Sequence, residues 1–160
     1  MMQYTIEEHL VTLRVKPASL LIRIVLLIFS VISFLATLFF LFSYGRANLI
    51  VSLFLSLLFF LSGLFLLRLV LWNTYGKEKV YFFENSIQYR AYYGWYKGKL
   101  KTYNLTPNKE FKYLIVPRGY EEEQKGILRI IAGSGTLSCA TMLPISELER
   151  LIVEIEGVHI

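Results

Sequence analysis

The stretches IVLLIFSVISFLATLFFLFS (Ile24–Ser43) and ANLIVSLFLSLLFFLSGLFLL (Ala47–Leu67) decide the fold of this 160-residue chain. Neither stretch contains a charged residue, and each is about as long as the ~20 apolar residues that cross a bilayer core as an α-helix. Only Tyr44, Gly45 and Arg46 separate them, which is too few residues to hold a domain. The sequence therefore predicts a hairpin of two transmembrane helices over residues 19–72.

The positive charges beside the hairpin predict its orientation. Arg46 is the only basic residue in the turn, whereas three basic residues lie close to the hairpin on each outer flank: Arg14, Lys16 and Arg23, then Arg68, Lys77 and Lys79. Lys and Arg near spans favour the cytoplasmic side. We therefore expect both termini in the cytoplasm. Four side chains are expected to anchor the spans at the interface: Arg23, Tyr44, Arg68 and Trp72.

Small and hydroxyl residues recur within both apolar stretches. Ser33 and Thr37, and likewise Ser52 and Ser56, are four residues apart, and Gly63 follows in the second stretch. Such residues allow helices to approach closely in lipid. The pattern indicates helix packing either within the hairpin or against other membrane helices, and the sequence leaves both open.

The residue pattern changes after Gly76. Short aromatic and β-branched segments separated by turn residues predict strands, and a helical apolar repeat that includes Leu148, Leu151 and Ile155 predicts an amphipathic helix, with a capping box formed by Ser146 and Glu149. We expect residues 76–160 to form a cytoplasmic α+β or all-β domain, an antiparallel sheet of about six to seven strands closed by the C-terminal helix. Segment 1–18, which alternates at positions 11–16, is expected to add a strand to this sheet.

The composition argues against several kinds of chemistry. The chain has no Asp, one Cys and two His near opposite ends, whereas metal sites and acid–base catalysis draw mostly on Asp, Glu, His and Cys. One cysteine excludes an intramolecular disulfide and a Cys-based zinc cluster. We assign no catalytic, metal or cofactor-binding residue and expect a protein that is not an enzyme. Cys139 is expected to be buried in a strand, and Gly133-Ser134-Gly135 to form a hairpin turn.

One surface is a candidate binding site. If the strands 86–93 and 98–105 are joined by a turn at 94–97, Tyr92 lies opposite Lys99, and Arg90 lies opposite Lys101. Since like charges facing each other are destabilising, a neutralising partner is expected. The alternatives are an acid of the same domain beside a solvated sheet face, an acidic partner protein, an anionic lipid headgroup and a phosphorylated ligand. The balanced charge after Trp72 speaks against nucleic acid. The predicted face comprises Arg90, Tyr92, Lys99, Lys101, Tyr103 and the turn residue Trp95.

Three short stretches resemble a known family. Residues 4–8 (YTIEE), 83–87 (FENSI) and 143–149 (LPISELE), with two spans after a short first segment, resemble the bacterial pleckstrin-homology-like (YcxB-like) membrane proteins. Leu71-Trp72-Asn73 is similar to the end of the second span in the photosystem I assembly protein of plastids and cyanobacteria. These resemblances imply a binding or scaffold protein that contacts membrane lipids and another membrane protein or complex as an accessory or assembly subunit. Self-association stays open.

Overall fold

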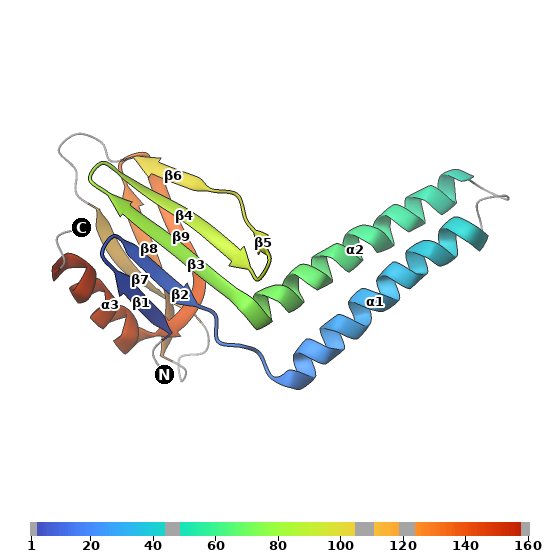
Figure 1. Ribbon diagram of the computed structural model, residues 1–160, viewed down its shortest axis with the longest axis horizontal. Helices are drawn as coiled ribbons and strands as arrows, with labels where there is room; N and C mark the ends of the chain where they lie inside the picture. Colours follow the sequence, from blue (N-terminus) through green and yellow to red (C-terminus); the bar gives the residue numbers. More distant parts are fainter. Residues whose placement is uncertain (1–2, 44–48, 105–110, 119–123, 158–160) are drawn as a thin grey trace. The chain divides into compact units, whose positions relative to one another are not determined.

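The computed structural model describes residues 3–43, 49–104, 111–118 and 124–157. The chain divides into two compact units, of which one spans Pro17–Thr74 and the other combines Met1–Lys16 with Tyr75–Ile160. Figure 1 shows the first unit as a pair of helices and the second as β-sheets with one helix. The helical pair is thus inserted into the chain of the second unit, between β2 and β3.

Two long helices make up the first unit. α1 spans Leu20–Ser43 and α2 spans Leu49–Tyr75, and both are long and apolar enough to cross a membrane. Only 11% and 17% of their most apolar windows are buried, whereas a water-soluble protein would cover an apolar surface of this size. The two helices are therefore candidate membrane-spanning helices.

α2 continues three residues beyond Trp72, where the hairpin was predicted to end. Arg68 is followed by three apolar residues, and neither Gly nor Pro occurs between Arg68 and Gly76. Since nothing in this stretch ends a helix, α2 runs to Tyr75, and the first strand after it begins at the next residue.

The first sheet is antiparallel and has six strands: β1 (Tyr4–Glu7), β2 (Leu10–Arg14), β3 (Gly76–Phe83), β4 (Ser86–Tyr93), β5 (Tyr96–Lys97) and β6 (Lys101–Asn104). The strand order is β1-β2-β3-β4, and both β5 and β6 pair with β4. β2 and β3 are neighbours, and they are also the strands that lead into α1 and out of α2. The chain leaves and rejoins this sheet at adjacent strand ends, where Arg14 pairs with Lys77.

The second sheet has three antiparallel strands, β7 (Lys112–Pro117), β8 (Lys125–Ala132) and β9 (Gly135–Pro144), and α3 (Ile145–Gly157) packs against it. Leu148, Leu151 and Ile155 form the buried face of α3. The core of this unit combines apolar side chains from both sheets and α3, the fully buried ones being Val11, Leu13, Val80, Phe82, Ile87, Leu128, Ile130, Leu143, Leu148, Leu151 and Ile155.

Further details differ from the sequence prediction, and the single predicted sheet is divided into two sheets of six and three strands. The described residues contain nine strands rather than six to seven, because β1 and the two-residue β5 carry too short a pattern to be recognised. α3 begins at Ile145, so Ser146 lies inside its first turn and is not the N-cap. Tyr44, one of the four predicted interface anchors, lies outside the described residues.

Candidate functional site

The register predicted for the strands after Ser86 is wrong. A two-residue turn, Gly94-Trp95, joins β4 to β5, and Tyr92 pairs with Lys97. Further along, Tyr89 pairs with Lys101. Between these two pairs β4 has two residues, whereas the opposite segment has the three residues 98–100, which is a one-residue bulge. The prediction had assumed a four-residue turn at 94–97 and no bulge.

The bulge moves two of the predicted residues away from the candidate face, because a shift of one residue turns every side chain to the other side of a sheet. Lys101 and Tyr103 lie opposite Tyr89 and Ile87, the buried residues of β4, and not opposite Arg90 and Gln88. Tyr103 reaches the second sheet, since a Cβ on Gly135 would lie 3.6 Å from its ring. The structure therefore does not bring Lys101 and Tyr103 together with Arg90.

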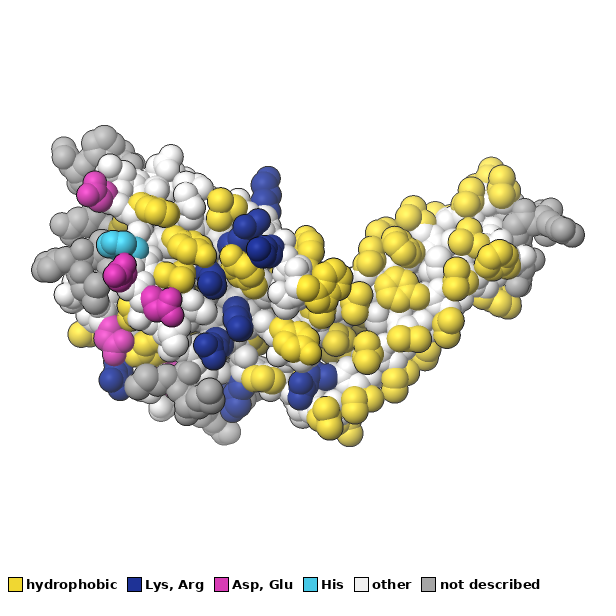
Figure 2. All heavy atoms as spheres, viewed as in Figure 1, with side chains coloured by type: hydrophobic (Ala, Val, Ile, Leu, Met, Phe, Trp, Pro, Cys, Tyr) yellow, Lys and Arg dark blue, Asp and Glu magenta, His cyan; other side chains and the backbone are white. Residues whose placement is uncertain are grey.

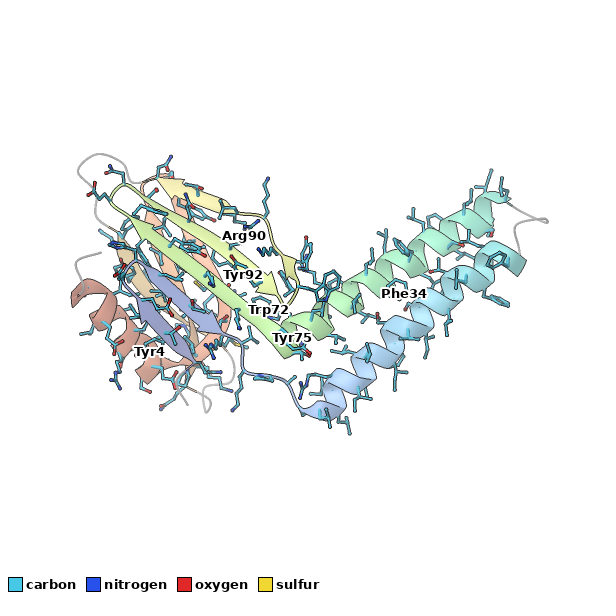
Figure 3. The ribbon with its side chains drawn as sticks, in the orientation of Figure 1. Tyr4, Phe34, Trp72, Tyr75, Arg90 and Tyr92 are labelled. Carbon is cyan, nitrogen blue, oxygen red and sulfur yellow. The ribbon has the colours of Figure 1, made fainter. Side chains whose placement is uncertain are left out.

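Arg90 and Tyr92 remain together on the outer side of β4 (Figure 3). On β3, the neighbouring strand, Lys79 pairs with Arg90 and Lys77 with Tyr92. Like charges thus do face each other, but across β3 and β4. The outer side of the first sheet, which we call the basic face, carries five basic side chains in two adjacent rows: Arg14, Lys77 and Lys97, then Lys79 and Arg90.

The contacts of the basic face are to tyrosines and backbone. Lys79 Nζ lies 5.6 Å from the ring centroid of Tyr92, within cation–π range, and Arg90 Nε donates to the Gly98 carbonyl at 3.0 Å. Burial, and then Tyr92, raise the pKa of the Tyr81 hydroxyl, while Arg90 lowers it, so Tyr81 is neutral at pH 7. Among the described residues, none of the five basic side chains forms an ion pair. The charge of this face is therefore not neutralised there.

The exposed acidic residues of the same sheet lie toward the opposite strand ends. Glu7 and Glu8 belong to the β1–β2 turn region and Glu84 to the β3–β4 turn, and all three are exposed. Figure 2 shows most of the Lys and Arg side chains in this view gathered apart from the Glu side chains. A hollow of about 490 Å³ at the acidic end is lined by residues 7–10 and 81–83. The exposed charges of this sheet are thus separated along the strands, with basic side chains toward one end and acidic side chains toward the other.

The remaining predicted residues of the face lie outside regular pairing. Trp95 is 78% exposed in the β4–β5 turn, and Lys99 is exposed within the bulge. Their role in binding stays a prediction.

The small and hydroxyl residues predicted for helix packing are buried within the helical unit: Ser33, Thr37, Ser52, Ser56 and Gly63. Ser56 Oγ donates to the Thr37 carbonyl of α1 at 3.4 Å, and Ser30 Oγ donates to the Gly63 carbonyl of α2 at 3.0 Å. A Cβ on Gly63 would lie 3.0 Å from the ring of Phe34. These small and hydroxyl residues pack α1 against α2. A further membrane helix would therefore pack against the exposed Leu, Ile and Phe side chains of the pair.

The predicted interface anchors lie on the two helices. Arg23 is half-buried near the start of α1, and its Nε has no hydrogen-bond partner among the described residues. Arg68 is exposed and Trp72 half-buried on α2. An anchoring role for these residues stays a prediction.

Glu78 is a fully buried carboxylate that the sequence analysis missed. It comes from β3 and accepts hydrogen bonds from the backbone N–H groups of Ala140 (2.8 Å) and Thr141 (2.7 Å) and from the Tyr89 hydroxyl. Burial, and then the charge of Glu78, raise the pKa of Tyr89, so the phenol keeps the proton that it donates. The signal was in the sequence, because Glu78 is in phase with the core residues Val80 and Phe82.

A bulge in β9 explains why a carboxylate is needed there. Ile127 pairs with Met142 and Arg129 with Ser138, so Leu128 alone faces the three residues 139–141. The N–H groups of Ala140 and Thr141 donate to Glu78 and not to β8. An unpaired buried N–H would be costly. Glu78, on the first sheet, therefore joins the two sheets by accepting hydrogen bonds from the two N–H groups of the β9 bulge.

Cys139, the single cysteine, lies in the same bulge. Its side chain is 1% exposed, and burial, followed by the charge of Glu78, raises the pKa of the thiol well above its usual value. Because the thiolate is the reactive form, Cys139 is protected in the folded domain.

Among the described residues, no three His, Cys or Glu side chains come together as a metal site would require. The candidate site is therefore the basic face, five basic side chains in two adjacent rows on the outer side of the first sheet. Comparisons of the chain with models of protein families, with curated proteins and with solved structures found no match.

Proposed function

We propose that the protein is a non-enzymatic accessory subunit of a membrane protein complex. The two helices anchor it in the inner membrane of a bacterium with both termini in the cytoplasm, and the sheet unit, a pleckstrin-homology-like domain, binds an acidic surface of the partner through the basic face.

The observation that carries this proposal is the pair of like-charge contacts across adjacent strands, Lys79 with Arg90 and Lys77 with Arg14. Like charges directly opposite each other destabilise a sheet, and no described acid relieves them. An acidic partner surface would do so. The mixture of Arg, Tyr and Lys on a sheet face also suits a protein partner, since Arg and Tyr are enriched in protein interfaces.

Purification of the full-length protein from its native membrane in mild detergent tests this proposal. We expect a stoichiometric complex with a second membrane protein, and we expect added salt to dissociate it, because exposed charges are screened. Recovery of the protein alone from several mild detergents at low salt would contradict the proposal.

A second candidate function is binding of anionic lipid headgroups by the basic face. It is favoured by chain position, since Lys77 comes two residues after the end of α2, and basic residues near an anionic leaflet gain about 1 kcal/mol each. In this case a photo-cross-linker placed on the basic face would form adducts with lipid and not with a protein. One cross-linking experiment therefore distinguishes the two candidate functions.

A further inference from the structure

The β4–β5 turn exposes aromatic side chains. Trp95 is 78% exposed, Tyr96 is 50% exposed and Tyr75, beside them, is 58% exposed. Large exposed aromatic groups mark contact surfaces. We call Tyr75, Trp95 and Tyr96 the aromatic tip.

The turn is fixed in place by its neighbours. Gly94 adopts a φ of +75°, which glycine tolerates and most residues avoid. A Cβ at this position would lie 3.3 Å from the Tyr75 ring, so the turn packs directly on Tyr75. Tyr93 pairs with Gly76 and with Tyr96, which holds both sides of the turn in the sheet. Trp95 is therefore presented by a turn that packs on Tyr75 and is paired in the sheet on both sides.

The position of Tyr75 decides what the tip meets. Tyr75 is the last residue of α2, and the sheet begins at Gly76 with no linker between them. Chain continuity alone therefore brings the turn to the end of a candidate membrane-spanning helix. This end is the level at which Trp and Tyr are enriched in membrane proteins, because their rings are apolar and their N–H or O–H groups are polar.

Basic residues flank the tip. Lys77 and Lys97 both pair with Tyr92, which is separated from the turn by Tyr93 alone. Lys99, two residues after Lys97, is exposed. Lys and Arg at this level are attracted to anionic phospholipids. Aromatic side chains between lysines, at the end of a span, have the composition of a membrane-interface anchor.

We propose that the β4–β5 turn is a membrane-contact site, in which Trp95 and Tyr96 insert at the headgroup level of the bilayer that α1 and α2 span, and the exposed Lys99 contacts anionic phospholipid headgroups. This site does not depend on the partner proposed above. It adds a contact between the sheet unit and the lipid surface through the turn.

Tryptophan fluorescence of the full-length protein tests the site. The chain has two tryptophans, Trp72 and Trp95, so Trp72→Phe leaves Trp95 as the only reporter. The protein is reconstituted into vesicles of phosphatidylcholine with phosphatidylglycerol. We expect brominated phospholipids to quench Trp95, acrylamide in the water to quench it weakly, and its emission to lie at shorter wavelength than that of tryptophan in water.

The matched control is a reporter at the opposite end of β4. In the background Trp72→Phe with Trp95→Phe, Glu84→Trp places an indole in the exposed β3–β4 turn, about ten residues from the aromatic tip along the strand and roughly 25–30 Å away. We expect acrylamide to quench this reporter severalfold more than it quenches Trp95, with little quenching by lipid.

Two results would overturn the proposal. If acrylamide quenches Trp95 as strongly as the control, the turn lies in water. If neither quencher reaches Trp95, the turn is covered by protein, and a protein contact replaces the lipid contact.

Discussion

Replacing Glu78 by Ala is expected to lower the free energy of unfolding of the sheet unit more than any other single change considered. The substitution leaves the buried N–H group of Thr141, the partly buried N–H group of Ala140 and the hydroxyl of Tyr89 without an acceptor. At 1–3 kcal/mol for each unsatisfied group, the free energy of unfolding falls by about 3 kcal/mol or more. That is a large share of the 5–15 kcal/mol that stabilises a typical domain.

Cys139 supplies the measurement, because it is the only cysteine of the chain and is buried beside Glu78. A maleimide reagent labels it only when the domain opens. A loss of about 3 kcal/mol raises the labelling rate of the full-length protein in its membrane about a hundredfold. Labelling in denaturant corrects for any change in intrinsic thiol reactivity.

Tyr89→Phe is the matched control for Glu78→Ala. It removes one of the three donors but keeps the carboxylate over both backbone N–H groups, so we expect a loss of only about 1 kcal/mol. Labelling rates of Glu78→Ala and the unsubstituted protein within twofold of each other would show that Glu78 does not hold the two sheets together.

Reversing three charges of the basic face is expected to abolish partner binding without weakening the fold. In the triple variant Lys77→Glu, Lys79→Glu and Lys97→Glu, acidic side chains would face the acidic partner. Like charges across an interface cost several kcal/mol, and even a total of about 3 kcal/mol weakens the Kd roughly a hundredfold. The variant should no longer co-purify with the partner.

The fold is expected to gain stability from the same change. Glu at positions 77 and 79 would lie opposite Arg14 and Arg90, which turns two repulsive pairs into attractive ones worth about 0.2–1 kcal/mol each. The rate of Cys139 labelling should therefore stay equal or fall. Binding lost together with faster labelling would mean that the variant had merely unfolded.

A control with the same change in net charge separates location from total charge. Lys101→Glu, Lys112→Glu and Arg118→Glu reverse three exposed basic side chains that lie off the basic face. We expect this variant to keep its partner. Equal loss in both triple variants would assign binding to overall charge and would remove the basic face from the account.

The sequence predicted the coarse fold because its strongest signals are local. Two uncharged runs of about twenty residues allow few alternatives to helices, and the alternation from Ser86 to Tyr93 matches the inward and outward positions of β4. α2 ends at Tyr75, three residues beyond the predicted end at Trp72, because neither Gly nor Pro occurs between Arg68 and Gly76 to end the helix.

The basic face could be predicted only in part, because its partners come from non-local pairing. Arg90 and Tyr92 were identified from their own strand, but the one-residue bulge at 98–100 has no clear sequence signature and reversed the side on which Lys101 and Tyr103 lie. Lys79 was overlooked as the neighbour of Arg90, since only the following strand had been considered. Glu78 was missed for a related reason, because the backbone N–H groups that donate to it belong to a bulge 62 and 63 residues later in the chain.

The central claim is that the basic face contacts a protein, and photo-cross-linking from Tyr92 tests it most directly. Replacing Tyr92 by benzoylphenylalanine keeps an aromatic side chain among Lys77, Lys79 and Lys97 without changing their charges. Val153, which is 68% exposed on α3, is the control position. After irradiation of intact membranes, we predict one protein adduct from position 92 and none from position 153. Adducts to lipid alone from position 92, or the same protein adducts from both positions, would contradict the account.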